Sequence, residues 1–124
     1  MTPNADAVRH WAETVLRQLR APRGHTLTVT PADPQGVEVT LGCPDGTSTS
    51  VLLERGMAEA EAVVMLAGQL QDGVLESTGG APAPPCPASG HSHPAVAAVV
   101  DGVASWTCPQ GGGTRPVLPP PAAA

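Results

Sequence analysis

The sequence of 124 residues contains no lysine, isoleucine, phenylalanine or tyrosine, and asparagine occurs once. Codons for these residues are rich in A and T, whereas alanine, glycine, proline, valine and arginine are abundant. We therefore expect the gene to come from a high-GC bacterium or its phage. Because only Trp11 and Trp106 supply aromatic bulk, the core must consist mainly of valine, leucine and alanine. Such a core is modest, and the length allows one ordinary domain or one small domain with an appendage.

Positive charge is also scarce, since six arginines stand against eleven acidic residues and the net charge is −5. Binding to nucleic acid needs clustered lysine and arginine, so we expect no nucleic-acid partner. The sequence has no apolar run of membrane-spanning length and no N-terminal apolar region typical of a signal peptide. We therefore expect no membrane association and a cytoplasmic location. Three cysteines, an odd number, fit a reducing compartment better than a secreted disulfide framework.

Residues 1–78 predict a small α-β-β-β-α body. Apolar residues recur every three or four positions from Val8 to Leu19, which indicates an amphipathic helix. Three runs that alternate polar and apolar residues follow, each bounded by proline or glycine turns, at 26–30, 37–41 and 47–53. Short turns between such runs predict an antiparallel three-stranded meander.

A second helix is predicted from about Met57 to Glu76, with Gly73 as a position where it kinks or ends. Helix, three strands and helix is also the element order of double-stranded-RNA-binding domains, which this body resembles in that order alone. Those domains grip phosphates with basic residues at the start of the second helix. Here that position carries Glu59 and Glu61, so we expect no RNA binding.

The C-terminal third contains the clearest hairpin signal of the chain, an Asp101-Gly102 pair between two strand-like runs. If these are the two turn residues, Ala97 lies opposite Trp106. Side chains alternate between the two faces of a strand, so Cys108 shares the face of Trp106. The small alanine leaves room for the large indole.

Four potential metal ligands, Cys86, His91, His93 and Cys108, follow the pattern Cys-x4-His-x-His-x14-Cys. An extended segment before the hairpin places both histidines on the face of Cys108, and Cys86 then folds back toward them. Zinc favours thiolate and imidazole ligands in a tetrahedral arrangement. The sequence therefore predicts one zinc ion per chain. If one histidine is a bystander, a solvent molecule or Cys43 fills the fourth position.

Two other interpretations of these residues stay open. A disulfide between Cys86 and Cys108 needs an oxidising compartment. Alternatively, the thiols are ordinary small core residues and the histidines lie at the surface. Cys43 is a further candidate because Pro44 follows it, as a proline follows each of the other cysteines. As a catalytic nucleophile it lacks a base that the sequence makes visible.

The dipeptides Cys86-Pro87 and Cys108-Pro109 begin like the knuckles of zinc ribbons, with a hairpin between them. Residues 86–109 thus resemble half of a zinc ribbon, although neither knuckle has a second cysteine two residues later. The two histidines replace these cysteines on one side only. The resemblance covers about a fifth of the chain and implies a metal rather than a function.

The predicted fold is α+β: the body of residues 1–78, a Gly/Pro/Ala linker at 79–85, a separate hairpin with a metal site at 86–109, and a disordered tail at 110–124. We expect a small non-catalytic, zinc-stabilised protein-interaction or accessory module that presents Trp106 or the proline-rich tail to an unidentified protein partner. The alternatives are a metal-dependent enzyme or a metal sensor that uses the same four ligands. An enzyme needs a general base near the metal, and Asp101 belongs to the far turn.

Overall fold

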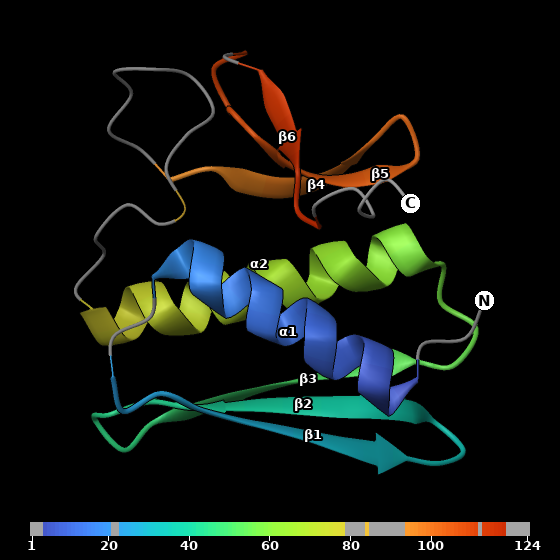
Figure 1. Cartoon of the computed structure of the whole chain (residues 1–124), viewed down its shortest axis with the longest axis vertical. Helices are drawn as coiled ribbons and strands as arrows, with labels where there is room; N and C mark the ends of the chain where they lie inside the picture. Colours follow the sequence, from blue (N-terminus) through green and yellow to red (C-terminus); the bar gives the residue numbers. More distant parts are fainter. Residues whose placement is uncertain (1–3, 21–22, 79–83, 85–93, 112, 119–124) are drawn as a thin grey trace, which may run out of the picture.

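The structure is a computed structural model that describes residues 4–20, 23–78, 84, 94–111 and 113–118. Its elements form three layers, with helices α1 (Ala5–Leu19) and α2 (Glu59–Thr78) between two three-stranded antiparallel sheets (Figure 1). The body sheet comprises β1 (Thr26–Ala32), β2 (Gly36–Gly42) and β3 (Ser48–Glu54). The C-terminal sheet comprises β4 (Val96–Val100), β5 (Val103–Thr107) and β6 (Thr114–Pro116). The α+β class and the predicted order of helix, meander, helix and hairpin are confirmed.

Helix α1 is delimited by a cap at each end. The side chain of Asn4 accepts a hydrogen bond from the backbone N–H of Ala7 at 2.9 Å, which satisfies one of the unpaired donors of the first turn. Arg20 ends the helix in the left-handed conformation, with φ of 51°. The predicted apolar stripe is buried, and it includes Val8, Trp11, Val15 and Leu19.

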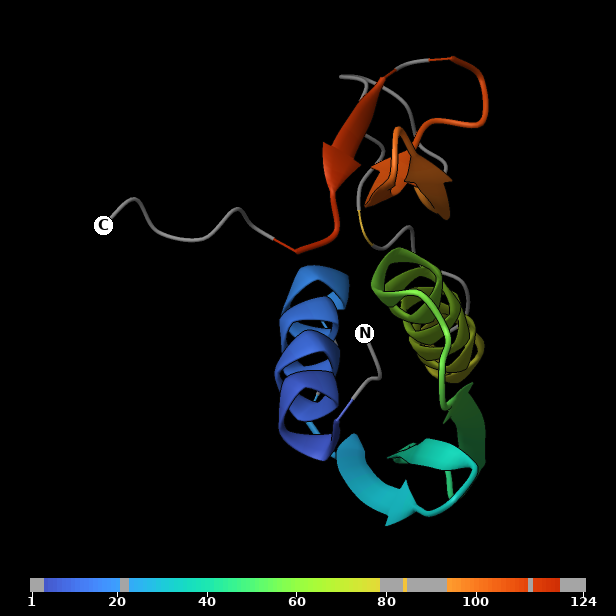
Figure 2. The same ribbon diagram turned by 90° about the vertical axis from the view of Figure 1, so that its right-hand side faces the viewer.

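The body sheet has the meander topology that the alternating runs predict. Val39 in the central strand pairs with Val29 in β1 and with Val51 in β3, and all three valines are buried. Leu41 and Leu53 complete the buried face, which packs against the helices. Viewed at 90° to the first view, the two helices lie side by side over this curved sheet (Figure 2).

Helix α2 continues through Gly73 to Thr78 instead of ending at the glycine. A Cβ atom at this position would lie 2.9 Å from the Thr49 side chain and 3.0 Å from the Leu41 side chain. The glycine therefore allows the helix to approach the body sheet more closely than any other residue would. Its cost in helix propensity is about 1 kcal/mol, which contacts with the sheet offset.

The hairpin has the predicted register, with Ala97 opposite Trp106. Asp101 and Gly102 both have positive φ angles, of 50° and 77°, as a tight two-residue turn of this type requires. The hairpin is not a separate unit, however. Its inward-facing residues join the same buried cluster as the helices, and that cluster includes Ala95, Ala104 and Trp106.

The prediction of a disordered tail from residue 110 is wrong for residues 114–118. β6 pairs with β5, with Trp106 opposite Arg115, and Val117 is completely buried. Gly111 and Gly113 have positive φ angles of 81° and 110°, which let the chain reverse after β5. The glycine-rich composition thus encodes a turn before a short strand.

The predicted linker at 79–85 lies outside the described residues except for Pro84, and residues 119–124 of the predicted tail lie outside them entirely. Within the described chain, neither helix combines the length and apolar character needed to cross a bilayer.

Candidate metal centre

Cys108 is the one predicted zinc ligand that the structure describes, and it follows β5 directly. Its backbone N–H donates to the carbonyl of Gly113 at 3.0 Å, and its own carbonyl accepts from the N–H of Gly111 at 3.0 Å. Cys108 is buried, with 7% of its surface exposed. The turn therefore holds the thiol in a defined place at one end of the C-terminal sheet.

The other three predicted ligands, Cys86, His91 and His93, lie outside the described residues. Both ends of the segment that carries them are described. The N–H of Ala95 donates to the carbonyl of Pro84 at 3.1 Å, so the chain on either side of residues 85–93 is closed at its base. This base lies beside Val96, whose partner Thr107 directly precedes Cys108. The two described ends of this segment, Pro84 and Ala95, thus lie at the end of the sheet where Cys108 lies.

Helix α2 also contacts this end of the C-terminal sheet, through a side-chain hydrogen bond to Ala95. Nε2 of Gln71, a buried side chain, donates to the carbonyl of Ala95 at 2.7 Å. A hydrogen bond made by a buried amide is costly to lose, because the unpaired group would stay desolvated. Within the described residues, no group of three or more His, Cys, Asp or Glu side chains is placed to hold a metal.

The structure places Cys43 away from Cys108. Its thiol is directed to the carbonyl of Gly73, with sulfur and oxygen 3.8 Å apart, on the side of α2 that faces the body sheet. Gln71 reaches the C-terminal sheet from another side of the same helix. The two cysteines thus belong to different interlayer spaces, and the arrangement does not bring Cys43 to the predicted site as an extra ligand.

The shared Cys-Pro context of the two described cysteines has a local explanation. In both turns the cysteine carbonyl accepts a hydrogen bond at 3.0 Å from a glycine N–H three residues later, Gly46 in one case and Gly111 in the other. Both glycines have positive φ. The sequence Cys-Pro-x-Gly is therefore a way to end a strand in this fold, with or without a metal.

Trp106 lies in the interior, where no part of its side chain is exposed. Nε1 of the indole donates to Oε1 of Gln18 at 2.7 Å, and Nε2 of Gln18 donates to the carbonyl of Val117 at 2.5 Å. One glutamine of α1 thus holds both β5 and the segment after β6. This burial does not fit the expected presentation of Trp106 to a partner, since the hairpin face that carries the indole is the face that packs on the helices.

A contact between His25 and Ser77 was missed from the sequence. Nε2 of His25 lies 2.8 Å from Oγ of Ser77, although the residues are 52 positions apart. Asp45 lies near His25 as well. The hydroxyl and the backbone N–H of Thr47, at 2.6 and 3.0 Å, are the main causes that lower the pKa of Asp45 below its ordinary value. No local pattern in the sequence signals this association.

A serine beside a histidine invites comparison with an activated nucleophile. Here Oγ of Ser77 has one proton and two neighbouring acceptors, the carbonyl of Val74 at 3.0 Å and Nε2 of His25 at 2.8 Å, so the contact with the imidazole does not by itself mark an activated serine. Ser77 also lies in the last turn of α2, where the backbone carbonyls disfavour a developing negative charge. The pair ties β1 to the end of α2.

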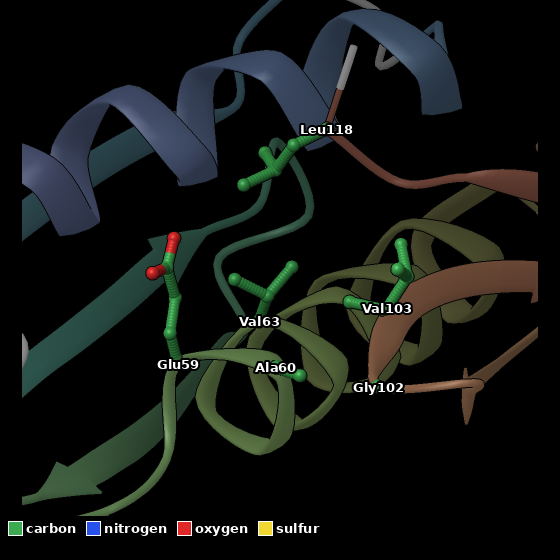
Figure 3. A pocket seen from close by; sticks show the side chains of 7 residues that line it. Glu59, Ala60, Val63, Gly102, Val103 and Leu118 are labelled. Atoms are coloured by element: carbon green, nitrogen blue, oxygen red, sulfur yellow. The ribbon is translucent and has the colours of Figure 1, made fainter. Parts of the chain in front are cut away.

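An apolar pocket lies where the turn of the hairpin meets the start of α2 (Figure 3). Glu59, Ala60 and Val63 line it from the helix, and Leu118 closes it from the side of α1. Its volume, ≈ 210 Å³, is smaller than the roughly 300–1,000 Å³ of sites for drug-sized ligands. Glu59 is the one charged residue of its lining, which offers no set of converging polar groups.

No protein-family model matches this chain, and no curated protein or solved structure is significantly similar to it. The function must therefore be inferred from the residues themselves.

Proposed function

We propose that this protein is a small non-catalytic module for protein interaction or assembly, in which one zinc ion stabilises the C-terminal sheet. The proposed ligands are Cys86, His91, His93 and Cys108. The supporting observation is that Pro84 and Ala95, which flank the segment carrying the first three, are hydrogen-bonded to each other at the same end of the sheet as Cys108. A buried thiol on a tight turn is a suitable zinc ligand.

An interaction role is supported by the apolar surface of the hairpin. Among the described residues, three of the five large hydrophobic side chains that are exposed lie on the hairpin: Val96 and Val103 on the face opposite Trp106, and Val99 on the Trp106 face. Each of them is between 44% and 49% exposed. Apolar residues that gather on one small element, rather than scattering singly, are typical of an interaction site. The hairpin surface, and not Trp106, is thus the proposed contact.

A metal-dependent enzyme is less well supported. Asp101, the carboxylate of the hairpin, lies at the turn, whereas Cys108 follows the opposite end of β5. Six residues separate them, and the length of strand from the turn to Cys108 corresponds to about 20 Å. We propose a bacterial or phage origin and a cytoplasmic location, where reducing conditions keep cysteine ligands available for zinc.

Cobalt substitution tests the ligand set. Cobalt(II) bound by thiolates in a tetrahedral site gives intense visible absorption, which we expect for the full chain at about one cobalt per chain. Cys108→Ser should abolish or strongly shift these bands because one thiolate is lost. Cys43→Ser is the matched control and should leave them unchanged, since that thiol contacts Gly73 in another layer. Bands that depend on Cys43 and not on Cys108 would contradict the proposal.

A further inference from the structure

The apolar pocket between the hairpin turn and the start of α2 has no part in the proposed metal site. It is lined from the helix by Glu59, Ala60 and Val63, from the hairpin by Gly102, Val103 and Ala104, and from the chain after β6 by Leu118. Its volume of ≈ 210 Å³ exceeds the roughly 150 Å³ of an apolar cavity that holds one benzene molecule. The pocket is therefore large enough for one side chain of a partner, although it is too small for a drug-sized ligand.

The lining combines aliphatic side chains with a single carboxylate. Figure 3 shows Val63 between Glu59 on one side and Val103 on the other. Glu59 precedes Val63 by four residues, so both side chains lie on one face of α2. Val103 is 49% exposed, so this wall of the pocket reaches solvent. A side chain that fits here has an apolar stem and a polar end group that a carboxylate binds.

The charges around the pocket favour a positively charged end group. Glu59 and Glu61 are exposed acids in the first turn of α2, and Asp101 directly precedes Gly102 in the hairpin turn. None of the described residues that line the pocket is basic. The start of a helix carries a partial positive charge of about +0.5, which the full negative charges of the two glutamates outweigh.

The charge of the chain as a whole also favours a basic partner. Residues 24–124, which include every residue of the pocket, contain two arginines and nine acidic residues. The net charge of the full chain is −5. A negative potential of this kind raises the rate at which a positively charged protein associates and disfavours acidic partners.

We infer that this pocket receives an arginine side chain from a partner protein. The aliphatic stem of the arginine packs between Val63 and Val103, and its guanidinium group pairs with the carboxylate of Glu59 at the rim. Arginine suits this position better than lysine, because a guanidinium group is more weakly hydrated and matches a carboxylate with two parallel hydrogen bonds. Residues that flank the arginine cover the exposed part of Val103, which a free small cation would leave in water.

The inference names the chemistry of the partner for the interaction role proposed above, and so rests on that role but not on the metal. NMR titration of the full chain tests it with the capped tripeptide Val-Arg-Val. In the control peptide, citrulline replaces arginine, with nearly the same shape but no charge. We expect the arginine peptide to shift the amides of Val63, Gly102 and Val103 with a Kd on the order of 1 mM, and to leave Val39 unchanged. The citrulline peptide should bind about two- to fivefold more weakly.

Three variants test the position of the charge and of the pocket. Glu59→Gln should weaken binding of the arginine peptide about two- to fivefold and leave binding of the citrulline peptide unchanged. Glu61→Gln is the matched control, because it removes the same charge from the same helix turn outside the pocket lining, and it should bind like the wild type. Ala60→Leu fills the pocket and should abolish the shifts caused by either peptide, while an unchanged Val39 amide shows that the variant is folded.

Four results would each overturn the inference. They are the absence of shifts at the pocket amides, equal binding of the two peptides, equal losses for Glu59→Gln and Glu61→Gln, and shifts that persist in Ala60→Leu. Putrescine, a free diamine, tests the source of the cation. Tighter binding of putrescine than of the arginine peptide at the same amides would mean that the occupant is not a protein side chain, which overturns the inference as well.

The same titration separates this inference from the function on which it rests. Shifts confined to Val96 and Val99 would place the contact on the hairpin surface alone, which overturns the pocket assignment and keeps the interaction role. Cobalt spectra of the same samples report the metal independently. Thiolate bands without peptide binding would overturn the pocket assignment and keep the metal site, whereas peptide binding without such bands would do the reverse.

Discussion

Replacing Trp106 with alanine should lower the free energy of unfolding by about 3–5 kcal/mol, the range typical of a large aromatic residue removed from a core. The indole is completely buried between the C-terminal sheet and the helices. Small domains have total stabilities of about 5–15 kcal/mol, so this loss takes a large share of the whole. Denaturant unfolding followed by circular dichroism measures it.

Two further variants separate the contribution of the indole hydrogen bond from that of the buried ring. Trp106→Phe keeps most of the ring volume but removes the donor to Gln18, so its cost should be smaller, about 1–3 kcal/mol. Val103→Ala, at a side chain that is 49% exposed on the same strand, should change the stability by less than about 1 kcal/mol. A loss for Trp106→Ala no larger than for Val103→Ala would mean that the sheet does not pack on the helices.

If the proposed zinc ion is bound, removing it with a chelator should loosen the C-terminal sheet from the end where Cys108 lies. We expect the amides of Ala95 and Cys108 to lose the most protection from hydrogen exchange, since both make the hydrogen bonds that close the ligand-bearing segment and the turn after β5. Amides in the middle of the body sheet, such as that of Val39, should keep their protection. Mass spectrometry of exchanged peptides resolves these regions.

The control for this experiment is Cys108→Ser, which should show the same exchange pattern with and without chelator. Equal protection at Ala95 and Cys108 in treated and untreated wild-type protein would contradict a structural metal at this corner. Loss of protection at Val39 as well would mean that the metal stabilises the whole chain rather than one sheet.

Most of the fold could be predicted from local patterns in the sequence. The stripe from Val8 to Leu19 and the alternating runs of the meander predict their elements because the period of burial is visible in the sequence. The Asp101-Gly102 pair predicts the register of the hairpin for a different reason. A two-residue turn with positive φ at both residues fixes which residues of the two strands lie opposite each other.

Packing between elements that are distant in the chain could not be predicted from the sequence. The hairpin register gives the face on which Trp106 lies, but not what that face contacts, and Gln18 is 88 positions away. Composition favoured disorder after residue 110, whereas the burial of Val117 and pairing with β5 outweigh it. At Gly73, close contact with the body sheet prevails over weak helix propensity.

The candidate site was predictable only in part. A list of cysteines cannot show that Cys43 and Cys108 end strands in different layers, because both have the same local sequence, Cys-Pro-x-Gly. The contact between His25 and Ser77 depends on the end of α2 lying beside the residue that precedes β1, which no local motif records. The types and spacing of the residues thus predict a metal site, whereas the fold determines which thiols lie close enough to bind the same ion.

Elemental analysis of the purified protein, prepared without chelator, tests the central claim most directly. The account predicts about one zinc ion per chain in the wild type and in Cys43→Ser, and none in the double variant Cys86→Ser/Cys108→Ser. A wild-type protein without metal, or a double variant that keeps its zinc, would contradict it.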